Sequence, residues 1–349
     1  MQEKIYIKTT LVILISFIGL KPLKSQSGCQ DLLSASSQAY TEGKYELVIK
    51  LLKDKLQQCE FTKLEIEQAT KILSASYLKL EEYELASQLV FKMLKNNPIY
   101  QIQTTSDPPP FIAVFNSFKV DPKIKIGLNL GQYHPLVIAG KSHQVLRNTE
   151  FNTKLKVNFG IHASSYVQYM LSDKLSVLME PGFSFISYHE NVDYANIASI
   201  TYSEKSPSLH FPLSIGFKIY QQNNISVSLF GGAQESFVIH TVSSLSYSLP
   251  GAGRYNASGF ENVRRKKFYT GLQTALKCEY NMTRYNFNFQ VDYGGYFNNY
   301  ELAGKNYSDN TLLTDYNYYP TDFKLQYLNF KVGVSYILKY KVEKKYKSE

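Results

Sequence analysis

Strict alternation of apolar and polar residues is the feature that most limits what this chain can fold into. The segment YNFNFQVDY (285–293) has an aromatic or aliphatic residue at every odd position and Asn, Gln or Asp at every even one. Successive side chains of a β-strand point to opposite faces, so the segment is predicted to form a strand with one apolar and one polar face.

The same alternation recurs along the second part of the chain. Its apolar positions fall within 124–130, 159–167, 175–185, 209–217, 225–229, 272–280 and 328–336. With 285–293 these segments make eight strands. Tyr and Phe, present 29 and 21 times, suit strands of this kind.

The connections between these strands alternate in length. Short turns are expected at 172–174, 222–224 and 281–284, and long polar connections at about 132–153, 191–206, 243–264 and 302–322. Short turns on one side and long loops on the other are typical of bacterial outer-membrane barrels. We therefore predict a mainly β fold, in which residues 123–338 form an eight-stranded antiparallel up-and-down transmembrane β-barrel. A secreted β-sandwich is the alternative.

The first 25 residues have the pattern of a signal peptide. Lys4 and Lys8 precede an apolar run from Leu11 to Leu20, which is too short to span a membrane. The chain is therefore expected to leave the cytoplasm. Lipidation of Cys29 stays open, because Gly28 precedes it but Gln26 stands where an aliphatic residue is usual.

Residues 26–100 have helical periodicity and are predicted to form a small periplasmic helical domain. The segment 72–100 resembles a tetratricopeptide repeat through Leu73, Tyr77, Tyr83, Ala86 and Pro98, and 39–52 resembles one more loosely. This resemblance implies protein binding. Two repeats are fewer than the three usually needed for stability, so a further support is expected.

Two features accompany this domain. A disulfide between Cys29 and Cys59 is the candidate support, with two free thiols as the alternative, and Cys278 is expected to be unpaired. The linker 101–122 contains Pro108, Pro109 and Pro110 and is predicted to be extended rather than helical. Its apolar second half is expected to dock against the helices or the barrel.

The strand segments also resemble a known family. LMEPGFSF (178–185) and LHFPLSIGFK (209–218) are similar to strands of Bacteroidetes outer-membrane β-barrel proteins. The resemblance covers 123–338 and implies an outer-membrane barrel without naming an activity. Eleven residues follow Leu338, whereas such barrels commonly end on an aromatic strand residue, so 339–349 is interpreted as a basic periplasmic tail.

Motifs of known chemistry are few. The sequence contains no HExxH, CxxC, phosphate loop or nucleophile elbow, so no cofactor or metal is expected. A cluster of five lysines in the tail contributes to the net charge of +9, and no nucleic-acid-binding motif accompanies this charge. The alternation of inward and outward positions places five charged side chains in the lumen, where they are expected to form a charge network. They are Glu180, Lys277, Glu279, Asp292 and Lys331.

An eight-stranded barrel has an interior just wide enough for side chains, so function is expected at its two ends. The leading hypothesis is a non-enzymatic barrel that anchors a periplasmic or envelope protein through the helical repeats. The alternatives are an outer-membrane enzyme acting on envelope lipid or peptide, and a small ligand-binding or transport barrel. For the enzyme alternative, the candidate catalytic residues are the lumen-facing His162, His210, Ser164 and Ser214.

A basic run follows the third long connection. It consists of Arg264, Arg265, Lys266 and Lys267. At the outer rim these side chains are predicted to meet phosphates of outer-membrane lipid, including lipopolysaccharide.

Overall fold

The computed structural model describes residues 27–139, 151–194, 198–249, 253–261, 266–299, 318 and 323–345, in two compact units. Unit 1 comprises 1–120 and 342–349, and unit 2 comprises 121–341. The predicted signal peptide, Arg264 and Arg265 lie outside the described residues. Within the described part of the chain, no helix has the length and apolar character needed to cross a membrane.

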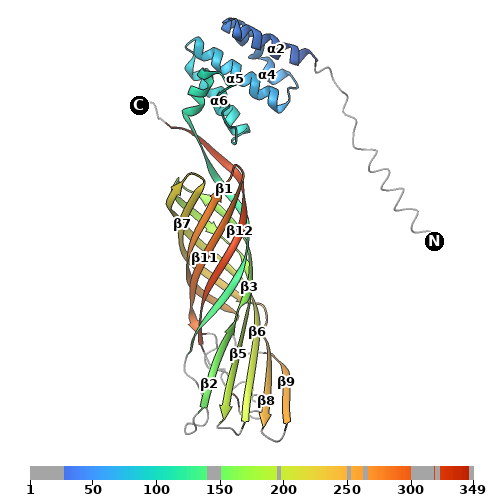
Figure 1. The fold of residues 1–349 in the computed structure, drawn as a ribbon, viewed down its shortest axis with the longest axis vertical. Helices are drawn as coiled ribbons and strands as arrows, with labels where there is room; N and C mark the ends of the chain where they lie inside the picture. Colours follow the sequence, from blue (N-terminus) through green and yellow to red (C-terminus); the bar gives the residue numbers. More distant parts are fainter. Residues whose placement is uncertain are drawn as a thin grey trace, which may run out of the picture. The chain divides into compact units, whose positions relative to one another are not determined.

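Unit 1 is helical (Figure 1). Its helices are α2 (Ser27–Thr41), α3 (Tyr45–Leu52), α4 (Lys55–Gln58), α5 (Lys63–Lys79), α6 (Tyr83–Asn96) and α7 (Pro109–Asn116). Gly43, with φ of 76°, allows the tight turn between α2 and α3. Thr62 and Glu65 form a capping box that starts α5. The fully buried side chains Val48, Leu52 and Leu73 contribute to the core that joins α3 to α5.

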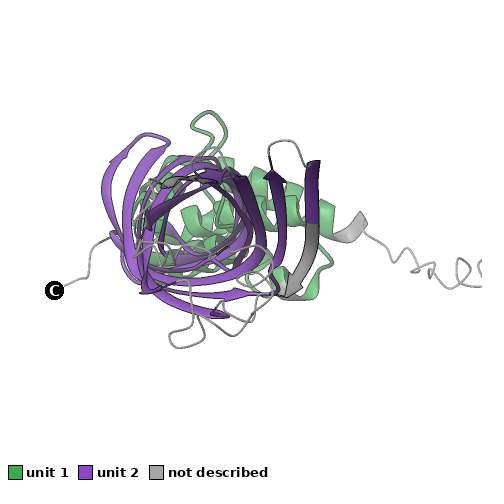
Figure 2. Ribbon diagram, turned by 90° about the horizontal axis from the view of Figure 1, so that it is seen from below, with its two compact units in different colours: residues 1–120, 342–349 green, residues 121–341 purple. Residues whose placement is uncertain are grey.

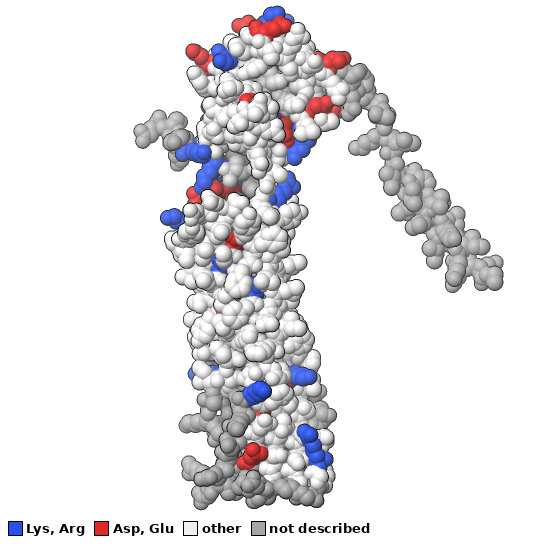
Figure 3. Space-filling model, in the orientation of Figure 1, with Lys and Arg blue, Asp and Glu red and all other residues white. Residues whose placement is uncertain are grey.

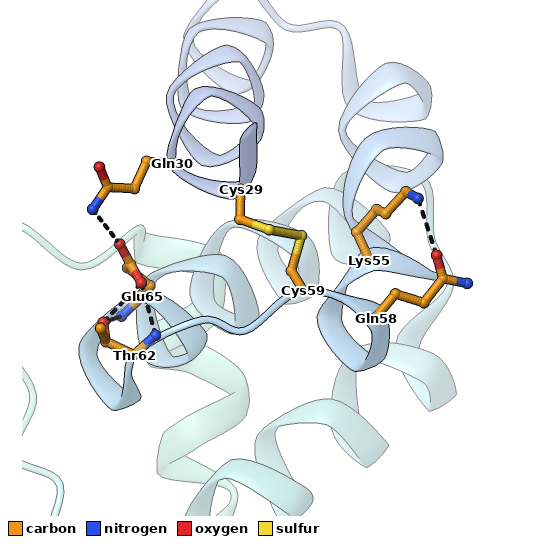
Figure 4. Close-up of a disulfide and its surroundings, with 7 residues drawn as sticks. All are labelled: Cys29, Gln30, Lys55, Gln58, Cys59, Thr62 and Glu65. Atoms are coloured by element: carbon orange, nitrogen blue, oxygen red, sulfur yellow. Dashed lines mark hydrogen bonds between the residues drawn. A yellow bond between two sulfur atoms is a disulfide. The ribbon is translucent and has the colours of Figure 1, made fainter. Parts of the chain in front are cut away.

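A disulfide joins Cys29 in α2 to Cys59, which follows α4 (Figure 4). The Cα atoms of the two residues are 5.9 Å apart, within the usual range for this bond. Cys278 is unpaired and exposed. The disulfide closes a loop that contains α3 and α4, and both sulfurs pack against the core of the helical unit.

The prediction that the proline-rich segment is not helical was wrong. Pro108 is the N-cap of α7, and Pro109 and Pro110 occupy its first turn. Prolines are tolerated there because the first backbone amides of a helix have no intrahelical acceptor. The apolar side of α7 packs against helices as expected, with Phe111 fully buried in a cluster that includes Val90 and Leu94.

A buried ion pair holds the start of this segment. Lys71 on α5 lies 2.8 Å from the carboxylate of Asp107, which also accepts hydrogen bonds from the Tyr100 hydroxyl at 2.5 Å and the Gln103 amide at 2.9 Å. Burial raises the pKa of the Asp107 carboxyl, but the hydrogen bonds from Lys71 and Tyr100 outweigh it and leave that pKa below its ordinary value. Burial and the bond to Asp107 raise the pKa of Tyr100.

Unit 2 is a single antiparallel sheet that closes into a ring (Figure 2). Its strands are β1 (Phe118–Ala139), β2 (Phe151–Asn158), β3 (Gly160–Met170), β4 (Leu175–Met179), β5 (Gly182–Tyr194), β6 (Ala198–Gln222), β7 (Ile225–Val238), β8 (Val242–Leu249), β9 (Gly253–Glu261), β10 (Phe268–Asn281), β11 (Tyr285–Asn299) and β12 (Phe323–Lys344). The first residues of β1 and the last of β12 belong to unit 1.

The predicted eight-stranded antiparallel ring is confirmed. Its members in order are β1, β2 with β3, β4 with β5, β6, β7, β10, β11 and β12, which pairs with β1. Two of the eight are each broken once, at Phe159 and at Glu180–Pro181. Proline cannot donate to a strand ladder, which accounts for the second break.

Two connections predicted to be polar loops are strands instead. β5 and β6 stay paired from Gly182 and His210 to Tyr194 and Ala198, and β8 and β9 form a further hairpin beside β6. Ser and Tyr recur in these segments, and both residue types occur in paired strands as well as in solvent-exposed loops. We call this the hairpin end of the ring, and the opposite end, with turns at 171–174, 222–224 and 281–284, the turn end (Figure 1).

The last strand is also longer than predicted. It continues past Leu338 to Lys344, and Val342 packs against the unit 1 cluster around Phe118 and Phe91. The amide of Lys345 donates a hydrogen bond of 2.7 Å to the Ser117 carbonyl. The lysines of this stretch do not prevent strand formation, because their side chains are exposed.

Side chains of the ring alternate as the sequence predicts. On β10 the odd residues from Tyr269 to Glu279 are inward, whereas Leu272, Leu276 and Tyr280 are exposed outward. The viewed face of unit 2 carries few charged side chains along most of its length (Figure 3). The ring therefore has an apolar outside and a polar inside, the reverse of a soluble protein.

Candidate functional site

Six charged side chains fill the lumen between the middle and the turn end. All five predicted members are buried there, and Lys125 of β1 joins them. Sequence reasoning missed Lys125, although its position between outward Ile124 and Ile126 signals an inward side chain.

The first cluster is centred on Lys331 of β12. Its ammonium lies 2.6 Å from Glu180, at the break between β4 and β5, and 2.5 Å from Asp292 of β11. Glu180 also accepts hydrogen bonds from Asn129 and Ser164 at 2.7 Å. These contacts join side chains of β1, β3, β11 and β12 to the break between β4 and β5 across the interior.

The second cluster is centred on Glu279 of β10. Lys125 and Lys277 lie 3.0 and 3.2 Å from its carboxylate. The ammonium of Lys277 also lies 4.0 Å above the centre of the Tyr166 ring, a cation–π contact. The two clusters together hold three lysines and three carboxylates, so their formal charges cancel.

Next to the first cluster, toward the hairpin end, lies a layer of histidine, serine and tyrosine. His210 contacts the Ser184 hydroxyl at 2.5 Å and the Ser236 hydroxyl at 2.7 Å through its two ring nitrogens. The candidate serines are engaged elsewhere: Ser164 donates to Glu180, and Ser214 accepts from Gln273 at 3.1 Å. Neither candidate serine therefore has a hydrogen bond to His162 or His210 among the described residues.

A small cavity separates this layer from the first cluster. It measures about 10 Å³, room for about one water molecule, and is lined by Tyr133, His162, His210, Glu180 and Lys331 among others. Among the described residues, the buried Nδ1 of His162 has no hydrogen-bond partner. A water in the cavity would satisfy such a group.

Aromatic side chains fill the lumen beyond the histidine layer. Tyr188 and Tyr202 donate hydrogen bonds of 2.6 and 3.0 Å to Glu204, and Tyr318 donates one of 2.7 Å to Glu190. These tyrosines are buried in one cluster with Phe323. Side chains thus fill the interior from the ion-pair clusters to the hairpin end.

Two further expectations concern ligands. No group of three or more metal-binding side chains occurs among the residues that the structure describes.

The structure describes two residues of the basic run, just before β10 begins. Lys266 is partly buried and Lys267 is exposed. The Lys266 carbonyl accepts a 2.6 Å hydrogen bond from the Tyr269 hydroxyl.

No protein-family model matches the chain, and no curated protein matches it. Among solved structures, the chain is similar to Neisserial surface protein A, with 9% identity and a TM-score of 0.28 over 63% of this chain and 99% of that one. It is also similar to the outer membrane protein OprG of Pseudomonas aeruginosa, with 12% identity and a TM-score of 0.32 over 62% and 95%.

A major outer membrane protein of Thermus thermophilus is similar at 14% identity and a TM-score of 0.33, over 61% of this chain and 98% of that one. All three of these structures are of bacterial surface or outer-membrane proteins.

Proposed function

We propose that this chain is a non-enzymatic bacterial outer-membrane β-barrel with a closed lumen, which anchors a periplasmic helical unit that holds an envelope protein. The observation that carries the proposal is the neutral ion-pair network across the lumen, beside a cavity with room for about one water. A lumen filled in this way offers no path for a solute. Function then falls to the two ends of the barrel.

Membrane insertion is supported by the outward face of the ring. Exposed aromatic side chains follow its apolar belt along β11, from Tyr285 near the turn end to Phe297 twelve residues further. Twelve residues span roughly 40 Å of strand, which a tilt of about 45° shortens to a height comparable with an apolar band about 25 Å tall.

An anchoring role is supported by the way the chain joins the two units. It passes between them twice, at Val120–Asp121 and at Lys341–Val342. A load on the helical unit would therefore be carried by β1 and by β12, the neighbouring strands that close the ring. Leu64 of α5 and Tyr83 of α6, exposed by 72% and 64%, are apolar side chains available to a partner.

The lipid contacts of the barrel are part of the proposal. Lys267 is exposed at the hairpin end, where outer-leaflet phosphates would lie in this topology. Together with the rest of the basic run it would contact lipopolysaccharide.

Three measurements test the proposal. In planar bilayers the purified protein should show no steady conductance, and a stable open channel would contradict a closed lumen.

The topology is tested in intact cells that express the protein without Cys278. An impermeant maleimide should label the variant Tyr255→Cys on β9 but not the variant Asn223→Cys in the β6–β7 turn. A photo-crosslinker at position 64 should capture one defined envelope protein that a crosslinker at position 255 does not, and capture of nothing would remove the anchoring role.

A further inference from the structure

The outer surface of the ring has a hollow that lies outside the lumen. This hollow, the wall groove, has a volume of about 290 Å³ and lies across β10, β11 and β12. Its floor is formed at Gly294 and Gly295, and its walls include Leu272, Tyr293 and Phe297. Because glycine has no side chain, the outward position of Gly295 leaves a gap in the apolar belt.

The packing behind the floor shows that the groove is built into the wall. The ring of Tyr327 covers Gly294 from the inside, where a Cβ would collide with it. The pairing of β11 with β12 shifts register between Gly295 and Asn299, a local irregularity that begins at the floor of the groove.

Polar groups line the groove together with its apolar walls. The hydroxyl of Tyr293 donates a hydrogen bond of 3.0 Å to the Gln326 side chain. Gln326 pairs with Gly295, so this bond crosses the groove beside its floor. Lys324 faces outward two residues before Gln326 on β12, about 7 Å further toward the hairpin end, and is exposed. The groove thus combines apolar walls with hydroxyl and amide groups, and a cation lies beside it at its hairpin end.

Membrane lipids carry the matching groups. An acyl chain leads to ester or amide groups, and these lead to a headgroup that is anionic in many envelope lipids. The groove lies between Tyr293 and Phe297, at the hairpin-end edge of the apolar belt, which is the depth at which chain and headgroup meet.

We propose that the wall groove binds the acyl chain of an anionic lipid, whose ester or amide groups meet Tyr293 and Gln326 and whose headgroup meets Lys324. This inference rests on the proposed membrane insertion. The groove would make this sector of the barrel selective for particular lipids, whereas the rest of the belt contacts bulk lipid.

Absence of tryptophan from the chain permits a direct test. Phe297→Trp places one reporter beside the groove, and Phe289→Trp places a reference reporter outward on β11 away from it. Each variant is reconstituted in phosphatidylcholine vesicles that contain increasing brominated phosphatidylglycerol, whose bromine atoms quench a tryptophan in contact with them. The preference for phosphatidylglycerol over phosphatidylcholine at each reporter is the measured quantity.

We expect the reporter at position 297 to show a preference of about fivefold for phosphatidylglycerol, and the reporter at position 289 to show none. The reason is that one exposed lysine near a membrane surface contributes about 1 kcal/mol to the binding of an anionic lipid, which corresponds to about fivefold. Gly295→Leu should fill the groove and abolish the preference, because a Cβ at this position already meets Gln326 at 3.3 Å. Gly231→Leu is the matched control, since Gly231 also faces outward and a Cβ there meets no atom within 4 Å.

Lys324→Gln should reduce the preference at position 297 as well, whereas Lys339→Gln, an exposed lysine near the turn end, should not. Equal quenching by both lipids at both reporters would overturn the groove while leaving membrane insertion intact. Absence of quenching at both reporters would instead overturn membrane insertion. A preference that survives Gly295→Leu would show that the headgroup binds without the groove and would also overturn the proposal.

Discussion

Replacing Lys331 by methionine would leave two carboxylates without their shared cation. Glu180 and Asp292 both contact this ammonium, at 2.6 and 2.5 Å, and all three side chains are buried. Removing one partner of a buried ion pair typically costs about 3 to 5 kcal/mol, because the remaining charge stays desolvated. We expect a loss of about 4 kcal/mol in the free energy of unfolding.

Neutralising the acids as well should reverse most of that loss. In the triple variant Lys331→Met, Glu180→Gln, Asp292→Asn the network carries no unpaired charge, and the amides keep acceptors for Asn129 and Ser164. Buried pairs are often replaced by neutral groups at little cost, so the triple variant should unfold within about 2 kcal/mol of the original.

Urea unfolding of the protein in lipid vesicles, followed by the faster migration of folded barrels in unheated detergent gels, measures these differences. Lys174→Met, in the exposed turn between β3 and β4, is the control and should change stability by less than about 0.5 kcal/mol. If Lys331→Met matched this control, or if the triple variant were as unstable as the single one, the reasoning about charge pairing would be refuted.

Three further predictions follow from other parts of the chain. Replacing Cys29 and Cys59 by serine should destabilise the helical unit by about 3 to 4 kcal/mol, because their disulfide closes a loop of 30 residues, and limited proteolysis of the full chain in urea would measure it; unchanged cleavage would contradict this. Because the pKa of Asp107 is lowered on folding, its contribution is complete above its unfolded pKa and is lost as the pH falls below about 4, so Asp107→Asn should unfold more easily at pH 7 and show a weaker acid dependence in the same assay. Gly232→Ala should prevent correct barrel folding on detergent gels, since its Cβ would collide with the Leu213 carbonyl, while Gly231→Ala should fold normally, and equal folding of both would show that the wall yields there.

Much of the barrel could be predicted because its alternation is read directly from the chain. Parity alone places Lys277, Glu279 and Asp292 in the lumen, since each lies between outward apolar neighbours. Which lysine meets which carboxylate could not be predicted, because that depends on the register of strands far apart in sequence. Lys125 and Glu279 pair although 154 residues separate them.

The errors have local physical causes. The α7 helix was missed because a proline run breaks a helix only in its interior, and here it forms the start. The β8–β9 hairpin was missed because its polar residues resemble a loop, while strand pairing supplies the hydrogen bonds that identify it. The wall groove leaves little mark in the sequence beyond Gly294 and Gly295, since its other walls come from strands whose register the sequence does not show.

Unit 1 contains residues from two distant parts of the chain, and this has a consequence for biogenesis. Its aromatic cluster around Phe91 and Phe118 is completed by Val342, which is 251 positions after Phe91 in sequence. During synthesis the helices emerge first, but this contact emerges only with β12, the last strand of the barrel. A chain cut short before Val342 would leave that cluster open, so completion of the helical unit reports that β12 has been made. Contacts of such long range form late, so the cluster stays open to proteolysis until the strands of the barrel have been synthesised.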